Sequence, residues 1–155
     1  MPLCGPPCAP NAMKINASFW DTSALLLLCV RQAESPTYRR LWQRSDRIVV
    51  WWGTTVEMRS ALSRLARGRE ITPQGLQFAL TRMEAMRPQW RAIAPSEKLR
   101  DRAEGLPDAY GVKALDAFQL AAALIWCQEK PKGRLFLCDD AQLSAAASQA
   151  GFTVK

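Results

Sequence analysis

Residues 115–126, LDAFQLAAALIW, are apolar on nearly every side of a helix and yet contain one carboxylate. The larger apolar residues recur at helical spacing, and aliphatic residues fill much of the opposite side. A helix that is apolar nearly all round is buried, so we expect a buried helix over residues 115–129. Asp116 is unusual there, because burying an unpaired charge costs several kcal/mol.

Outward from this helix, strand-like and helix-like segments alternate along the chain. The run DRIVVWW is β-branched and aromatic, which is typical of a buried parallel strand. The alternation predicts one α/β domain, a three-layer α/β/α sandwich with a central, mainly parallel sheet. The predicted strands cover residues 14–20, 46–52, 89–94, 133–138 and 152–155, and the predicted helices cover 22–32, 36–44, 54–68, 73–87, 96–106, 115–129 and 140–150.

The length of 155 residues suits a single domain. We expect residues 1–12 to be a disordered leader and residues 13–155 to be the domain, with Met13 as an alternative start. The leader lacks the basic start and apolar core of a signal peptide, and no apolar run is long enough to span a bilayer. The five cysteines lack paired zinc-knuckle spacing, which favours buried free thiols and a cytoplasmic location.

Composition limits the chemistry that the chain can perform. Histidine is absent, which excludes Ser-His-Asp and Cys-His catalysis, histidine bases and histidine-bearing zinc sites. Acid–base or metal chemistry must then rest on carboxylates, Cys, Lys, Tyr or water. The net charge of +7 comes mostly from arginine, which suits contact with phosphate or with an acidic protein segment; a generic basic surface is the alternative.

Several carboxylates are predicted at the edge where parallel strands end, which is where α/β sheets bind ligands. Asp21 follows the first strand, Glu57 lies in the first turn of the helix after the second, and Asp139 and Asp140 follow RLFLC. Asp116 lies near the start of its own helix. All five acids are therefore close to a helix N-terminus.

Helix capping is the alternative explanation for most of these acids. Asp21 and Asp140 fit N-caps, and Thr54 with Glu57 fits a capping box in which Glu57 reaches back to the amide of the cap residue. Capping does not account for Asp116. A divalent cation held by several carboxylates would account for it, and oxygen ligands favour Mg²⁺ or Mn²⁺.

Four blocks of the sequence are FWDTSALLLL (19–28), TTVEMRSALSRL (54–65), ALDAFQLAAAL (114–124) and LFLCDDAQLSAAASQAGF (135–152). In this order and at these separations they resemble PIN-domain proteins, and more narrowly the VapC-type toxins of bacterial toxin–antitoxin pairs. The resemblance spans residues 14–155. It implies a PIN-like sandwich and a Mg²⁺- or Mn²⁺-dependent endoribonuclease. It also implies a cognate antitoxin that inhibits the enzyme, and a homodimer.

By this resemblance, Asp21, Glu57, Asp116 and an acid after the fourth strand hold the metal and carry catalysis. Spacing favours Asp140 as the fourth acid, and Asp139 is the alternative. The implied reaction is phosphodiester hydrolysis, in which the metal lowers the pKa of a bound water and stabilises charge on the phosphate. The resemblance is compatible with either one or two metal ions in the site.

Two further residues are expected to support these ligands. Ser23 matches the DTS motif of the family and is expected to hydrogen-bond a ligand carboxylate or water. Cys138 departs from the family, which commonly has Ser or Thr two residues before the fourth acid. A thiol donates a weaker hydrogen bond than a hydroxyl, so Cys138 predicts weaker support for the site.

Arginines are the candidates for holding the RNA backbone, and a solvated helix face is the alternative for each of them. The candidates around the second helix are Arg39, Arg40, Arg44 and Arg47, and those after Glu57 are Arg59, Arg64, Arg67 and Arg69. Trp42, beside arginines, is a candidate for a groove that accepts an amphipathic antitoxin segment. The main rival function is a catalytically silent PIN-like module that binds RNA or protein. A phosphatase or receiver-like domain, and metal-dependent DNA cleavage, are further alternatives.

Overall fold

The computed structural model describes residues 14–155, and the predicted leader with Met13, Cys4 and Cys8 lies outside the described residues. Strands and helices alternate as predicted. In chain order the elements are β1 (Ser18–Trp20), α1 (Thr22–Cys29), α2 (Ser35–Arg44), β2 (Ile48–Trp51), α3 (Thr54–Arg67), α4 (Pro73–Met86), the short 3₁₀ helix η1 (Arg87–Gln89), β3 (Trp90–Ile93), α5 (Glu97–Glu104), α6 (Leu106–Tyr110), α7 (Ala114–Trp126), β4 (Leu135–Leu137), α8 (Ala141–Gln149) and β5 (Thr153–Val154).

The five strands form one sheet in the order β3-β2-β1-β4-β5, and every pair is parallel. Phe19 of β1 lies opposite Val49 on one side and Phe136 on the other. All residues of β1 and β2 are buried, as expected for central strands covered on both faces. The predicted α/β/α sandwich with a parallel sheet is confirmed.

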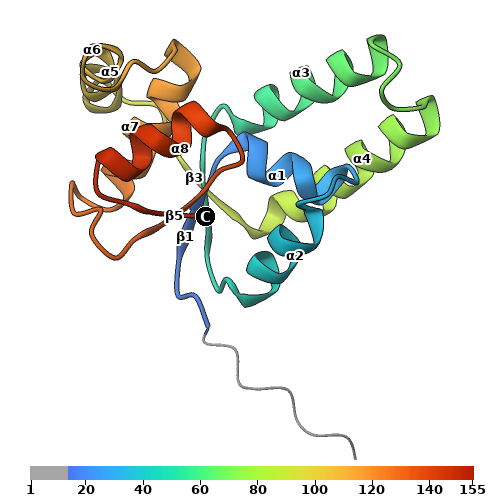
Figure 1. Ribbon diagram of the computed structural model, residues 1–155, viewed down its shortest axis with the longest axis horizontal. Helices are drawn as coiled ribbons and strands as arrows, with labels where there is room; N and C mark the ends of the chain where they lie inside the picture. Colours follow the sequence, from blue (N-terminus) through green and yellow to red (C-terminus); the bar gives the residue numbers. More distant parts are fainter. Residues whose placement is uncertain (1–13) are drawn as a thin grey trace, which may run out of the picture.

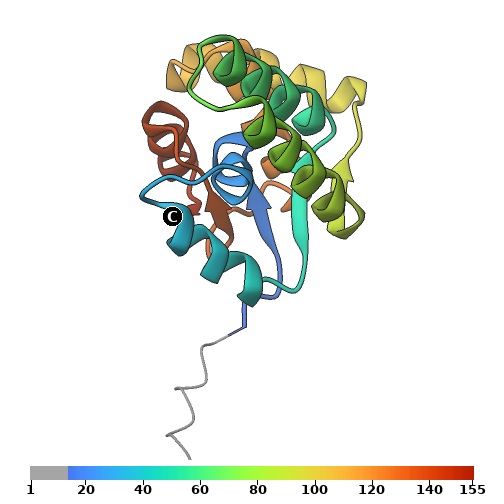
Figure 2. The same ribbon diagram turned by 90° about the vertical axis from the view of Figure 1, so that its right-hand side faces the viewer.

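Two hydrophobic cores lie on opposite faces of the sheet. Helices α1 to α4 pack against one face, where Trp20, Val50 and Leu137 point. Helices α5 to α8 pack against the other face, where Phe19 and Phe136 stack with ring centroids 5.2 Å apart. Figure 1 shows the two helical layers on either side of the sheet, and Figure 2 looks onto the layer that contains α2 and α4.

Some boundaries differ from the prediction. The buried helix ends at Trp126 rather than near 129, because Gln128 and Glu129 adopt left-handed backbone angles, with φ of 53° and 58°. The segment 96–106 forms α5 and then turns into the separate helix α6, which was not predicted. None of the helices within residues 14–155 combines the length and hydropathy that crossing a membrane requires.

The topology brings several helix N-termini to one edge of the sheet. Helices α1, α3 and α8 each begin within a few residues of the carboxyl end of a strand, β1, β2 and β4 respectively. Because all strands are parallel, these helix starts lie at the same edge. This is the edge at which the sequence predicts a site.

Candidate metal site

The four predicted acids line one pocket of about 320 Å³, called the acidic pocket below. Asp21 follows β1, Glu57 lies in the first turn of α3, Asp116 in the first turn of α7, and Asp140 precedes α8. Segments far apart in the sequence therefore bring four carboxylates together. The remaining lining residues are Thr22, Ser23, Leu26, Ser60, Ala61, Arg64 and Leu115.

Asp21 is the most buried acid of the pocket, with only 5% of its surface exposed. It caps α1 as predicted, because its Oδ2 accepts hydrogen bonds from the backbone N–H of Ser23 at 2.9 Å and from Ser23 Oγ at 2.6 Å. Burial raises the pKa of Asp21 above its ordinary value, and the hydrogen bonds from Ser23 oppose this rise. The predicted support of Asp21 by Ser23 is confirmed.

Glu57 does not form the predicted capping box. The N-cap of α3 is Gly53 rather than Thr54, and no side chain caps this helix. Glu57 points across to α1 and α7 instead, where its Oε2 accepts hydrogen bonds from Thr22 Oγ1 at 3.0 Å and Gln119 Nε2 at 3.1 Å. Its Oε1 is buried and has no hydrogen-bond partner within residues 14–155. Burial raises the pKa of Glu57, and the charges of Asp21 and Asp116 raise it further.

Asp116 is half-buried, in a first helical turn that is more open than predicted. Leu115 beside it is 60% exposed, and the fully apolar surroundings of α7 begin only at Ala117. Burial raises the pKa of Asp116, as do the charges of Asp140 and Asp21. The charges of neighbouring acids therefore add to the cost of ionising Asp116, and nearby Lys113 only partly opposes them.

Asp140 occupies the fourth position of the pocket, as the spacing predicts. It also caps α8, since its Oδ1 accepts a hydrogen bond from the backbone N–H of Leu143 at 2.8 Å. Asp139 does not line the pocket; its backbone N–H donates to Ser23 Oγ at 2.9 Å. Asp139 thus supports the site through its backbone, while its side chain is solvent-exposed.

Cys138 lies behind Asp21 as a buried thiol. Its Sγ is 3.7 Å from Asp21 Oδ2 and 3.6 Å from Ser23 Oγ. Burial raises the pKa of Cys138 to about 12, so the group is a protonated thiol at neutral pH. A neutral thiol donates only weak hydrogen bonds, which makes Cys138 a weak supporter of Asp21 and no metal ligand.

The residues fit a hydrated Mg²⁺ or Mn²⁺, although the pocket is not a preformed cage. Within residues 14–155, no three Asp, Glu or Cys side chains converge closely enough to hold a metal ion as they stand. The donor set consists of carboxylate oxygens, which these ions prefer, and Glu57 Oε1 is a buried acceptor with no donor among residues 14–155.

One arginine, Arg64 of α3, lines the acidic pocket. It belongs to the group of arginines after Glu57 that the sequence indicates as candidates for holding RNA. Arg59, of the same group, also lies on α3 and pairs with Glu84 at 3.6 Å in the open. Arg40 hydrogen-bonds Thr37, and the backbone of Arg44 bonds Ile15 at the opposite edge of the sheet.

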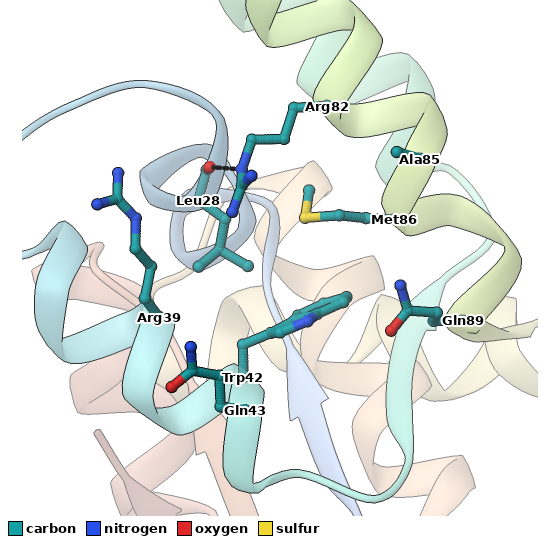
Figure 3. Close-up of a pocket in the computed structure, with 8 residues that line it drawn as sticks. All are labelled: Leu28, Arg39, Trp42, Gln43, Arg82, Ala85, Met86 and Gln89. Carbon is teal, nitrogen blue, oxygen red and sulfur yellow. Dashed lines mark hydrogen bonds between the residues drawn. The ribbon is translucent and has the colours of Figure 1, made fainter.

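A second pocket, called the cationic pocket below, lies between α2 and α4 and has a volume of about 270 Å³ (Figure 3). It contains Arg39 and Arg82, and no carboxylate is among its described lining residues. Figure 3 shows the Trp42 ring facing Met86, while Arg82 Nε donates to the carbonyl of Leu28. The other lining residues are Gln43, Ala85 and Gln89.

Gln119 is the residue that sequence reasoning missed. Its side chain is fully buried and bonds Glu57, yet the sequence presented it as one polar residue in an apolar run. The available signal was its spacing, because a residue three positions after Asp116 lies on the same helix face.

Comparison with known proteins tests the fold alone. No known family matches the sequence, and no curated protein matches it. The fold is similar to that of PAE2754 from Pyrobaculum aerophilum, with a TM-score of 0.63 and 18% sequence identity over 93% of this chain and 92% of that chain. At this identity the similarity supports the α/β architecture and carries no activity across.

Proposed function

We propose that this chain is a Mg²⁺- or Mn²⁺-dependent endoribonuclease of the PIN type. The observation that carries the proposal is the convergence of Asp21, Glu57, Asp116 and Asp140, from four separate segments, on one pocket. Structural capping accounts for Asp21 and Asp140 but leaves Glu57 and Asp116 unexplained. Two further observations support a cation-binding site in this pocket. Glu57 Oε1 has no hydrogen-bond partner within residues 14–155, and the pKa values of Asp21, Glu57 and Asp116 are raised.

Each group has a distinct task in this proposal. Asp21, Asp116 and Asp140 would hold the ion, and Glu57 would complete the same site or a second one. The bound ion would activate a water molecule and offset charge on the scissile phosphate. Ser23 orients Asp21, and Arg64, which lines the same pocket, would hold a phosphate of the RNA beside the acids.

The test is RNA cleavage by the purified protein, using a broad pool of structured and single-stranded RNAs with Mn²⁺ or with EDTA. Asp116→Asn is expected to lower the rate on the order of 100-fold, the typical cost of removing one group that stabilises charge in a transition state. A matched control is Asp108→Asn, an exposed acid in the first turn of α6 that does not line the pocket. Equal activity of both variants would contradict the proposal.

The rival function, a silent PIN-like module that binds RNA or protein, has one observation in its favour, the lack of a preformed ligand cage within residues 14–155. It predicts RNA or protein binding without cleavage and no Mn²⁺ binding in calorimetry. The nuclease proposal predicts both cleavage and Mn²⁺ binding. Calorimetry on the wild-type protein therefore separates the two functions, whichever RNA is the natural target.

We extend the proposal to the biological role that the resemblance implies, a VapC-type toxin in the cytoplasm that forms a homodimer and is inhibited by a cognate antitoxin. Arg39, Arg82 and Trp42 in the cationic pocket suit an acidic, amphipathic antitoxin segment. Expression in a bacterial host is expected to arrest growth, and Asp116→Asn is expected to abolish the arrest. Sedimentation of the purified protein tests the dimer.

A further inference from the structure

Gln119 is a fully buried amide in the middle of the otherwise apolar helix α7. Burying an amide without hydrogen bonds costs about 1–3 kcal/mol on the scale of protein mutations, so its partners need to be accounted for. Its neighbours on the helix, Leu120 and Ala121, are equally buried and entirely apolar. A leucine or methionine at position 119 would suit the core without this cost.

The amide of Gln119 is directed at Glu57. Its Nε2 lies 3.1 Å from Glu57 Oε2, 3.0 Å from Thr22 Oγ1 and 3.5 Å from Thr54 Oγ1, so three acceptors share its two hydrogens. Thr22 Oγ1 in turn donates to Glu57 Oε2 at 3.0 Å. The bonds among Gln119, Thr22 and Glu57 close a ring among α1, α3 and α7, in which one oxygen of Glu57 receives two donors.

The ring leaves its remaining acceptors unpaired. Glu57 Oε1 and Gln119 Oε1 are both buried and have no hydrogen-bond partner within residues 14–155. A network that served stability alone would satisfy these oxygens, because an unpaired buried acceptor is costly. Two donors on Oε2 fix the plane of the carboxylate, so the position of Oε1 is fixed as well.

We propose that Gln119 is a positioning residue, which holds Oε2 of Glu57 so that Oε1 stays available to a divalent cation in the acidic pocket. This inference rests on the proposed metal-dependent function. It adds a residue that does not line the pocket and that acts only through Glu57. Thr22 shares the task from α1.

The experiment measures Mn²⁺ affinity by calorimetry, with thermal unfolding in parallel. Gln119→Met keeps the volume and removes both polar atoms, and we expect about tenfold weaker Mn²⁺ binding, as is typical when a partner of a metal ligand is lost. Thermal stability in EDTA is expected to stay the same or rise, because the unpaired Gln119 Oε1 is removed too. Leu120→Met, at an equally buried position that cannot hydrogen-bond Glu57, is expected to leave Mn²⁺ affinity unchanged.

A double-mutant cycle tests whether Gln119 acts through Glu57. In the Glu57→Gln background, Gln119→Met is expected to cause no further loss of Mn²⁺ affinity. An undiminished tenfold loss in that background would overturn the proposal, and so would unchanged affinity of the single variant. If Gln119→Met does not fold, Thr22→Val removes the other donor to Oε2, and unchanged affinity of that variant would overturn the proposal.

Failure of this inference is distinguishable from failure of the proposed function. Wild-type protein that binds no Mn²⁺ would overturn the metal site itself, and the role of Gln119 with it. Wild-type protein that binds Mn²⁺ as tightly as Gln119→Met would overturn the role of Gln119 alone and leave the metal site standing.

Discussion

The acidic pocket and the cationic pocket have similar volumes, about 320 and 270 Å³, but opposite charge. Helix α1 borders both, with Leu26 lining the first and Leu28 the second. In the acidic pocket, burial and neighbouring charges raise the pKa values of Asp21, Glu57 and Asp116. In the cationic pocket Arg82 is exposed and Arg39 is partly buried, and none of the ion pairs formed within residues 14–155 involves either of them.

The difference in charge and burial indicates that the acidic pocket, rather than the cationic pocket, lowers the stability of the fold. Carboxylates that repel one another destabilise the fold unless a cation joins them, whereas solvated arginines cost little. Native proteins keep such unfavourable groups mainly at functional sites. The protein has a net charge of +7, but four carboxylates gather in the acidic pocket. This negatively charged region of a basic protein is the candidate catalytic site.

The largest expected effect is metal-dependent stability in the acidic pocket. At a Mn²⁺ concentration of 100 times Kd, binding to the folded state adds about 2.7 kcal/mol, a rise in Tm of roughly 5–10 °C for a chain of this size. Asp116→Asn is expected to remove this rise, and Arg39→Ala in the cationic pocket to retain it. Thermal scans with Mn²⁺ and EDTA provide the measurement. An equal rise in Tm on addition of Mn²⁺ in both variants would contradict the prediction that Mn²⁺ binds in the acidic pocket.

The next effect concerns Arg64, which lines the acidic pocket. Arg64→Ala is expected to raise the KM for RNA about tenfold, since hydrogen bonds to charged groups contribute about 1.5–3 kcal/mol. Arg59→Ala, on the same helix but paired with Glu84 in the open, is expected to change KM less than about twofold. Steady-state cleavage of one RNA by both variants tests this. A larger effect at Arg59 would place the RNA along α4 rather than over the pocket.

The sequence was sufficient to predict the fold, because the strand–helix alternation and the continuous apolar strands leave little choice of architecture. It also predicted the four acids, since the ends of parallel strands meet at one edge. Helix periodicity similarly identified α7, although not where it ends. The left-handed residues Gln128 and Glu129, which stop α7 early, are neither glycine nor asparagine and give no local signal.

The sequence did not allow us to predict contacts between helices that are distant in the chain. The motif Thr54-x-x-Glu57 matches a capping box, yet Glu57 instead accepts hydrogen bonds from α1 and α7, whose positions follow from the packing of three helices. For the same reason Gln119 was missed, as its partners are 97 and 62 residues away in the chain. Local sequence patterns therefore identified the acidic residues of the pocket, whereas their hydrogen-bond partners are determined by tertiary packing.

The pH dependence of stability tests the repulsion directly. Asp21, Glu57 and Asp116 have raised pKa values in the folded state, so just above pH 4 the folded protein binds more protons than the unfolded chain. Stability in EDTA is then expected to fall as the pH rises from about 4 through the raised pKa values. Asp116→Asn is expected to flatten this fall, and Arg39→Ala to leave it unchanged. Urea unfolding across this range would contradict the comparison if the wild-type protein gained stability instead.

The smallest expected effect is at Cys138, behind Asp21. In Cys138→Ser a hydroxyl replaces the thiol that lies 3.7 Å from Asp21 Oδ2, and a hydroxyl is the stronger donor. The stronger hydrogen bond favours the charged form of Asp21, so the pKa of Asp21 is expected to fall and Mn²⁺ affinity to rise by a few fold, corresponding to about 1 kcal/mol or less. Cys127→Ser, a buried thiol outside the pocket, is the control. If Mn²⁺ binds no more tightly to Cys138→Ser than to the wild type, the hydrogen bond from position 138 does not determine the Mn²⁺ affinity of the site.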